Sequence, residues 1–302
     1  MKYTSSDLAI IIPITNKKNV KKILFSIKKQ TKKPGQTLFI FNSKTNFKSE
    51  KKIIFAHSKI SNQVYQRNLG LKLINKKIKL ILQLDDKFYL HKKAIEKLIN
   101  EWNLADEDVA GIGIKSNFKY HNVNKFRLLK YLTLTGSNIP GKVLVSGFNT
   151  KLISNNNLTN VDWLQGGLSS WRLSYVQNIF YRRYPIVKWS ILEDLIFSYN
   201  IKIQKKYKLN FNNGIKAYII KDKSLNYDSK EFFYRGYENA RMQKIFVYMF
   251  EKNLSKLAFF YSYISSSFLG LLWNLFILNK KFFFYLGRLK GIFANINKIK
   301  VL

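Results

Sequence analysis

The sequence predicts an α/β fold with a mostly parallel sheet and helices on both of its faces. In the first half of the chain, apolar runs alternate with segments whose apolar residues recur every three or four positions. The apolar runs are continuous, as expected of strands that are buried on both sides. With 302 residues, 46% of them hydrophobic, the chain can form one large or two modest domains with an apolar core.

The predicted elements follow one another in strand–helix order. Residues 8–14 should form the first strand, and Asn16 can cap a helix over residues 17–29 that ends before Pro34-Gly35. Residues 115–160 are loosely patterned and should form a long excursion of the kind that shapes a binding site. The remaining strands are expected over residues 37–41, 52–56, 78–84 and 109–114, and the helices between them over residues 62–74 and 91–102.

Two pairs of adjacent acids stand out because acids are scarce: Lys and Arg number 53, and Asp and Glu 17. Asp85-Asp86 ends an apolar run, so the topology places it beyond the carboxyl end of a strand, where ligands bind in α/β sheets. Glu193-Asp194 precedes a segment with helical spacing and suits a general base. For both pairs, the alternative is helix capping or compensation of helix charge.

The formal net charge of +36 indicates an anionic partner, although a lysine-rich codon bias is a simpler explanation for part of it. A phospholipid surface or a phosphorylated ligand fits this charge. No nucleic-acid partner is expected, because Arg is scarce and no zinc-finger or RNA-binding motif is present. The absence of cysteine excludes disulfides and thiolate metal sites.

Residues 257–279 carry no charge and are flanked by Lys256 and Lys280-Lys281. Their length would suffice to span a membrane, but three consecutive serines dilute their hydrophobicity. Residues 280–302 hold six basic residues and no acid, and a single crossing would leave this tail on the unfavoured side. We therefore expect helices that lie in the cytoplasmic leaflet. A transmembrane helix and a buried helical pair are the alternatives.

The order of short motifs along the chain resembles glycosyltransferase family 2, which has the GT-A fold. The resemblance extends from about residue 8 to residue 220. Each motif alone is a weak signal, and the resemblance rests on all of them occurring in the family's order and at its spacing. Residues 232–241 and the apolar tail resemble the membrane-associated members that act in surface polysaccharide assembly. The matching segments are IIPITN (11–16), SIKKQ (26–30), QRNLG (66–70), LDD (84–86), VDWLQGG (161–167) with WR (171–172), and LEDLIFSY (192–199).

This resemblance implies an inverting transfer of a sugar from a nucleotide-sugar donor to a hydroxyl of a saccharide or lipid-linked acceptor. It implies that Asp85 and Asp86 bind ribose and a Mg²⁺ or Mn²⁺ ion. Asp194 would be the general base, with Glu193 as its neighbour or substitute. The other donor contacts that it implies are Pro13, Thr15, Asn16 and Asn42 at the nucleoside, Arg67 at the diphosphate, and Gly166 and Gly167 where sugar or acceptor approaches the backbone.

Lys87 stands where the family usually has a third acid. Either Asp86 takes over as metal ligand, or Lys87 replaces part of the cation's charge. This departure leaves open a non-catalytic binding or scaffold protein on a degenerate GT-A fold, and a nucleotidyl or phosphosugar transferase is a further alternative. The expected domains are residues 1–225, catalytic, and residues 226–302, helices that associate with the cytoplasmic face of the membrane. The oligomeric state is not predicted.

Overall fold

The computed structural model describes residues 2–117, 127–152, 156–179, 191–220 and 227–295. The chain divides into two compact units. The predicted boundary after residue 225 lies within residues 221–226, outside the described residues. Unit 1 comprises Met1–Lys119, Ser154–Arg183 and Glu193–Asp222, and unit 2 comprises Tyr120–Ile153, Tyr184–Leu192 and Lys223–Leu302. Most of the long excursion therefore belongs to unit 2, although the predicted domains place it in the first.

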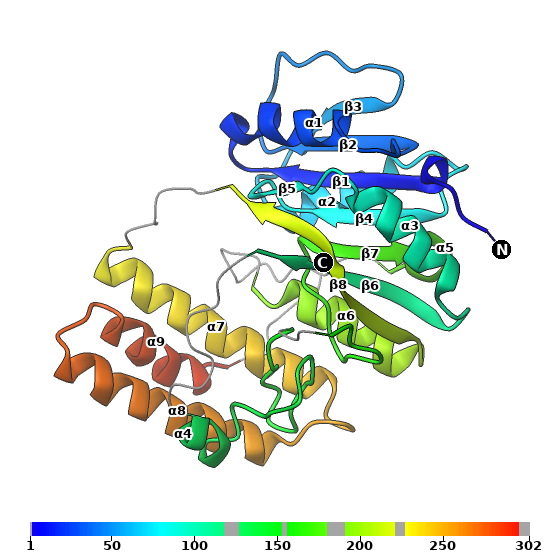
Figure 1. Ribbon diagram of the computed structural model, residues 1–302. Coiled ribbons are helices and arrows are strands. Elements are labelled where there is room, and N and C mark those ends of the chain that lie inside the picture. The colour runs from blue at the N-terminus through cyan, green and yellow to red at the C-terminus, as the bar shows by residue number, and fades with distance from the viewer. Residues whose placement is uncertain (1, 118–126, 153–155, 180–190, 221–226, 296–302) are drawn as a thin grey trace. The chain divides into compact units, whose positions relative to one another are not determined.

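Unit 1 is built on an eight-stranded mixed sheet with the order β3-β2-β1-β4-β7-β6-β8-β5 (Figure 1). Its strands are β1 (Leu8–Ile14), β2 (Gln36–Phe41), β3 (Ile53–His57), β4 (Leu80–Leu84), β5 (Phe88–Leu90), β6 (Val109–Ser116), β7 (Leu168–Arg172) and β8 (Lys208–Ile219). The strands from β3 to β4 are parallel, β7 is antiparallel to both β4 and β6, β8 is parallel to β6, and β5 is antiparallel to β8. The predicted α/β class is confirmed. The parallel strands β1 to β4 correspond to four of the apolar runs in the sequence.

The antiparallel strand β7 was not predicted, because it lacks a continuous apolar run. Ser169 and Ser170 are fully buried in it. The Ser170 hydroxyl donates to the Ile81 carbonyl at 2.8 Å and accepts from Trp102 Nε1 at 2.9 Å. Buried hydroxyls are tolerated when they are hydrogen-bonded in this way, so polar residues fill a central strand.

Helices cover both faces of the parallel part. On one face, Ile10 and Ile12 of β1 belong to the same core cluster as α1 (Val20–Lys28) and α3 (Ala94–Leu104). On the other, Ile11 packs with α2 (Gln63–Lys72). This division follows from the alternation of side chains along a strand. The other helices of unit 1 are η1 (Ser5–Asp7), η2 (Lys17–Asn19), α5 (Leu173–Val176) and α6 (Glu193–Gln204).

The predicted helix starts are confirmed at two asparagines. Asn16 accepts from the Lys18 amide and begins η2, which leads into α1. Asn62 accepts from the Val64 amide at the start of α2. Gln30, from the second motif, donates to the His91 carbonyl at 2.8 Å and accepts from the Ile95 amide at 3.1 Å. That motif residue therefore joins α1 to the start of α3.

Unit 2 contains α4 (Arg127–Leu132), α7 (Ser229–Met249), α8 (Lys256–Phe276) and α9 (Phe282–Ile292). The last three lie side by side (Figure 1). Glycines allow α7 and α9 to approach closely: a Cβ at Gly236 would lie 1.9 Å from the Phe284 carbonyl oxygen, and one at Gly287 would lie 2.0 Å from that of Phe233. The predicted C-terminal helices are thus present. In the described parts of the chain, no helix combines the length and apolar character needed to cross a membrane.

Candidate functional site

Parallel strands bring predicted site residues to one edge of the sheet. Thr15 and Asn16 follow β1, Asn42 follows β2 and Asp85 follows β4. Since these strands are parallel neighbours, the residues that follow them meet at the carboxyl edge. Pro13 is buried inside β1, one residue before its end, and is paired with β2.

Gly166 and Gly167 reach the same edge because β7 runs in the opposite direction. They directly precede β7, whose first residue, Leu168, is paired with the last residue of β4, Leu84. The amino end of β7 therefore lies at the same edge of the sheet as the carboxyl ends of the parallel strands.

A buried arginine joins the two acid pairs. Arg67, on α2, is 1% exposed. Its Nη2 lies 3.0 Å from Asp85 Oδ1, and its Nη1 lies 3.0 Å from Glu193 Oε1. Asp85 also accepts from Gln63 Nε2 at 2.6 Å. We call Arg67, Asp85, Glu193 and Asp194 the acid–arginine cluster.

The sequence resemblance assigns Arg67 to the donor diphosphate, and the structure gives it a different environment. Contact with a diphosphate would require the guanidinium to leave Asp85 or Glu193. Such a movement would leave a buried carboxylate unpaired, which costs several kcal/mol. In this structure Arg67 pairs with both acids, and its contact with the donor diphosphate stays a prediction.

Glu193 differs from an ordinary glutamate in its proton affinity. Burial and the neighbouring charge of Asp194 raise the pKa of Glu193 to about 7, although Arg67 opposes this shift. Its side chain is 11% exposed. A carboxyl group with a pKa near neutrality can hold or release a proton at physiological pH, and such groups cluster at functional sites.

Asp194 lies in the first turn of α6, as predicted, and is held from both sides. Its Oδ2 accepts from the Gly166 amide at 3.1 Å, and its Oδ1 accepts from the Leu195 amide at 2.9 Å. The Ser198 hydroxyl donates to the Asp194 carbonyl at 2.6 Å and anchors this turn.

The two glycines give the cluster its space. A Cβ at Gly167 would lie 2.1 Å from Asp85 Cγ. One at Gly166 would lie 2.8 Å from Asp194 Cβ and 3.0 Å from Arg67 Nη1. The resemblance gives these glycines a role in the approach of sugar or acceptor. The structure shows a further role, since any side chain here would displace the charged groups.

The Asp86 carboxylate accepts hydrogen bonds from the turn that follows β1. Its Oδ2 accepts from the Thr15 amide at 2.6 Å, the Thr15 hydroxyl at 2.7 Å and the Asn16 amide at 2.7 Å. Its carbonyl accepts from Asn19 Nδ2 at 3.0 Å. Asp86 therefore fixes the turn after β1, where the nucleoside contacts are predicted.

The acids at this edge do not fit a divalent ion held by protein ligands alone. The Asp85 carboxylate is surrounded by Gln63, Arg67 and Lys87, whose Nζ lies 3.4 Å from Asp85 Oδ2. One oxygen of Asp86 already accepts three hydrogen bonds. In the described residues, no group of three or more His, Cys, Asp or Glu is placed to hold a metal.

Two glutamines of α2 belong to the site but had no predicted role. Gln63 contacts Asp85, and Gln66 is fully buried. Gln66 Nε2 donates to the carbonyls of Ile14 at 3.0 Å and Ile40 at 2.6 Å, and so ties the ends of β1 and β2 together. The signal in the sequence is a run of polar residues on a helix that covers a buried sheet.

The sequence matches no protein-family model and no curated protein. Among solved structures, the chain is similar to the mannosyltransferase PcManGT from Pyrobaculum calidifontis, in complex with GDP-Man and Mn²⁺, with a TM-score of 0.53 and 10% identity over 97% of this chain and 90% of that one. It is also similar to S. aureus TarS 1–349, with a TM-score of 0.48 and 17% identity over 82% of this chain. This chain spans 65% of that TarS chain.

A second TarS structure, in complex with UDP-GlcNAc, matches with a TM-score of 0.47 and 15% identity over 89% of this chain and 72% of that one. At 10% identity, the likeness to the mannosyltransferase establishes a common fold and leaves the reaction open. The chain therefore has the mixed-sheet α/β fold of that glycosyltransferase.

Proposed function

We propose that this chain is a GT-A glycosyltransferase that moves a sugar from a nucleotide-sugar donor to a hydroxyl of its acceptor. The observation that carries the proposal is the acid–arginine cluster, which lies at the carboxyl edge of β1, β2 and β4. The fold shared with a mannosyltransferase solved with GDP-Man supports the same assignment.

In the proposed reaction, Asp194 accepts the proton of the attacking acceptor hydroxyl. The acceptor oxygen forms a bond to the anomeric carbon while the bond from that carbon to the diphosphate oxygen breaks. Attack from the face opposite the leaving group inverts the anomeric configuration. The nucleoside diphosphate leaves with the bonding electrons, and the proton stays on Asp194.

Asp194 is preferred to Glu193 as the base because their partners differ. Glu193 is paired with the guanidinium of Arg67, whereas Asp194 is held by backbone amides. Glu193 adjusts the charge of the cluster near neutral pH, and it can substitute as the base if its pairing with Arg67 opens.

The donor would lie over the turns that follow β1 and β2. Thr15 and Asn16, fixed by Asp86, would contact the nucleoside together with Pro13 and Asn42. The Lys87 side chain is 50% exposed beside Asp85, so its ammonium group can turn toward the diphosphate. Lys87 would supply positive charge there, whereas Mg²⁺ or Mn²⁺ stays a prediction.

The test is donor turnover by the purified full-length chain in detergent. A panel of nucleotide sugars is offered with and without Mn²⁺, and donor binding and product release are recorded. Asp194→Asn should lower turnover by roughly 10²–10⁴-fold while donor binding persists. Glu193→Gln should cost less, and Asp106→Asn, an exposed acid of unit 1, should change nothing.

The outcomes separate the alternatives. If no donor binds, the transferase assignment is wrong. If a donor binds but is never consumed, the chain is a binding protein on this fold, the alternative that Lys87 supports. Release of pyrophosphate in place of a nucleoside diphosphate would identify a nucleotidyl transferase. If Glu193→Gln abolishes turnover and Asp194→Asn does not, the base is Glu193.

We further propose that unit 2 associates with an anionic phospholipid surface, where a lipid-linked saccharide would be the acceptor. The helix α8 supports this, because three of its polar residues, Ser262, Ser267 and Asn274, are buried together with Phe259 and Tyr263. Large apolar residues of the same helix are exposed in a stripe with helical spacing: Leu257, Tyr261, Ile264, Phe268, Leu272, Leu275 and Phe276.

An ordinary surface helix exposes mainly polar residues, whereas α8 leaves a row of large apolar residues exposed. An exposed apolar stripe of this extent indicates an interaction surface. The tail supplies the complementary charge, since residues 280–302 contain six basic residues and no acid. The predicted position at the cytoplasmic face rests on the same basic residues, because the cytoplasmic leaflet carries the anionic lipids.

A further inference from the structure

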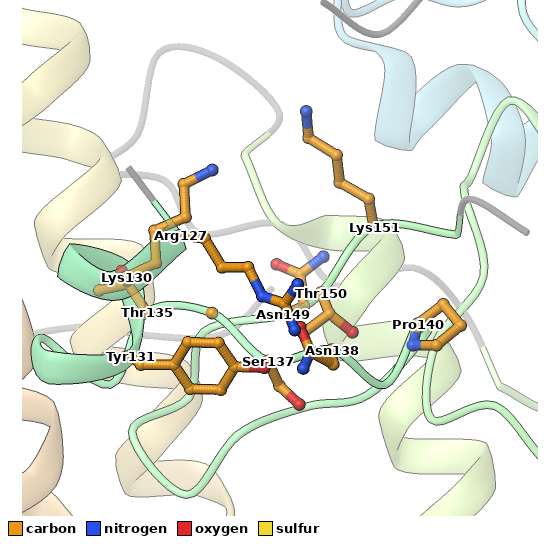
Figure 2. A pocket seen from close by; sticks show the side chains of 11 residues that line it. Arg127, Lys130, Tyr131, Thr135, Ser137, Asn138, Pro140, Asn149, Thr150 and Lys151 are labelled. Carbon is orange, nitrogen blue, oxygen red and sulfur yellow. The ribbon is translucent and has the colours of Figure 1, made fainter. Parts of the chain in front are cut away.

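The long excursion between β6 and β7 contains a basic pocket that lies entirely within unit 2. The cavity has a volume of about 260 Å³. It is lined by Arg127, Lys130, Tyr131, Thr135, Gly136, Ser137, Asn138, Pro140, Asn149, Thr150 and Lys151, which we call the basic pocket (Figure 2). Three of these side chains are cationic, and none of the described lining residues is acidic.

The three cationic residues come from different segments of the excursion. Arg127 and Lys130 extend from α4, and Lys151 comes from the end of the following loop (Figure 2). Partial burial and the nearby ammonium group of Lys130 lower the pKa of Lys151. The sequence places no Asp or Glu between Asp108 and Asp162, so the segment brings no carboxylate of its own.

The walls of the pocket are built by internal hydrogen bonds. The amides of Thr135 and Gly136 both donate to the Lys130 carbonyl, at 2.9 and 3.1 Å. The Thr150 hydroxyl donates to the Ile139 carbonyl at 2.7 Å and accepts from the Lys142 amide at 2.7 Å. These bonds close the loop on itself and hold the donors in place before any ligand arrives.

Gly136 and Ser146 complete this framework. A Cβ at Gly136 would lie 2.8 Å from Lys130 Cβ, so the glycine allows the turn to close against the lysine. The fully buried Ser146 hydroxyl donates to the Leu134 carbonyl at 2.6 Å, and Leu134 has a positive φ of 51°. A loop that maintains a strained residue and a buried hydroxyl is well determined, and such strain clusters at functional sites.

We propose that the basic pocket binds a phosphate or diphosphate group. Three cations suit an anion that carries more than one charge, and the planar Arg127 guanidinium can bind two phosphate oxygens at once. Hydroxyl and amide side chains, among them Thr135, Ser137 and Asn138, supply additional donors. The cavity is smaller than sites for drug-sized ligands, which begin at about 300 Å³. It therefore has room for a phosphate or diphosphate group. The assignment stands whether or not unit 1 transfers sugar.

Hydrogen exchange of the full-length chain in detergent tests this assignment, because the readout is local to residues 127–152. The soluble probe is inorganic pyrophosphate. In a separate arm, after removal of the detergent, phosphatidylcholine vesicles with and without phosphatidic acid, a lipid phosphate monoester, test a lipid source of the same group. We expect pyrophosphate to slow exchange in residues 127–152.

Matched variants tie the protection to the pocket. Lys130→Gln and Lys151→Gln should each weaken the protection by about tenfold or more, the loss of one charge-assisted hydrogen bond. Lys151→Arg keeps the charge and should bind like the wild type. Lys230→Gln, an exposed lysine of α7 in the same unit, should also have no effect. Thermal unfolding of each variant controls for misfolding.

The pattern of protection identifies the source of the group, and protection by both probes assigns the pocket to the phosphate group whatever carries it. Protection by phosphatidic acid vesicles, but not by phosphatidylcholine alone, assigns the group to a lipid headgroup. Protection by pyrophosphate only assigns it to a soluble phosphate ester. The proposal fails if no probe protects residues 127–152, if phosphatidylcholine alone protects them equally, or if both glutamine variants retain full protection.

Discussion

Arg67 and Lys87 both contact Asp85, but solvent reaches them differently. The Arg67 side chain is 2% exposed and pairs with two carboxylates, whereas the Lys87 side chain is 50% exposed and has Asp85 within 3.4 Å. Buried ion pairs are costly to break, and exposed ones contribute little. The two residues therefore offer a direct comparison at one carboxylate.

We expect Arg67→Met to lower the free energy of unfolding by about 3–5 kcal/mol, because Asp85 and Glu193, whose side chains are only 13% and 11% exposed, would lose the guanidinium that pairs with both. Lys87→Ala should cost about 0–1 kcal/mol. Denaturant unfolding of both variants measures the difference. Equal losses would show that the Arg67 pairs do not stabilise the fold more than a surface ion pair does.

The pH dependence of stability should report Glu193. Its pKa is raised from 4.5 to about 7 in the folded chain, so between these values the folded state binds more protons than the unfolded state. The free energy of unfolding should therefore fall as the pH rises through this window. The contribution of this group amounts to about 3 kcal/mol.

Glu193→Gln removes this titration and serves as the control. Denaturant unfolding of both proteins at about pH 5 and about pH 8 should show a larger decline for the wild type. If the two proteins decline equally, Glu193 does not titrate in this range. Because Asp194 lies beside it, the same titration should appear in the pH profile of donor turnover.

At the scale of elements, α7 and α9 pack through glycines that leave no space for a side chain. Gly236 faces the backbone of α9, which cannot move aside without shifting the helix. Gly270 on α8 is different, because the atoms nearest to a Cβ there belong to the ring of Tyr285, which can turn. The cost of an added methyl group should follow this difference.

We expect Gly236→Ala to destabilise unit 2 by about 1–3 kcal/mol, although Ala is the better helix former. Gly270→Ala should cost less, since the gain in helix propensity of about 1 kcal/mol offsets part of the rotation of Tyr285. Hydrogen exchange in α7 and α9 measures the effect. A stable Gly236→Ala variant would contradict the close packing of these helices.

At the scale of the whole molecule, the net charge of +36 and the exposed stripe on α8 lead to the same partner. Charge alone would give binding that salt abolishes, whereas an inserted apolar stripe gives binding that salt only weakens. A membrane surface with anionic lipid should therefore be bound by both contributions.

Leu257 and Phe276 are each 83% exposed at the two ends of α8. Replacing both by Ser should weaken binding to anionic vesicles by at least about tenfold, since each buried side chain of this size contributes about 1.5–3 kcal/mol. Phe25→Ser, at an exposed position of unit 1, is the matched control. Vesicle sedimentation at low and high salt measures the result, and equal binding by all three proteins would reject the α8 surface.

The sequence by itself determined the parallel half of the sheet, its helices and the prominence of the two acid pairs. Continuous apolar strands such as Leu8–Ile14, and caps such as Asn16, are local signals that survive folding. Local signals could not reveal β7, since its Ser169 and Ser170 are buried in a setting where Trp171 of the same strand, Trp102 of α3 and Ile81 of β4 hydrogen-bond their hydroxyls.

Only the tertiary structure decided how the acids are connected. Arg67 lies far from Glu193 in the sequence, and their contact requires α2 and α6 to meet at the carboxyl edge of the sheet. The same packing raises the pKa of Glu193, because burial and the charge of Asp194 act through space. The basic pocket has the same origin: its lysines are unremarkable in a lysine-rich chain until the loop closes and places them together.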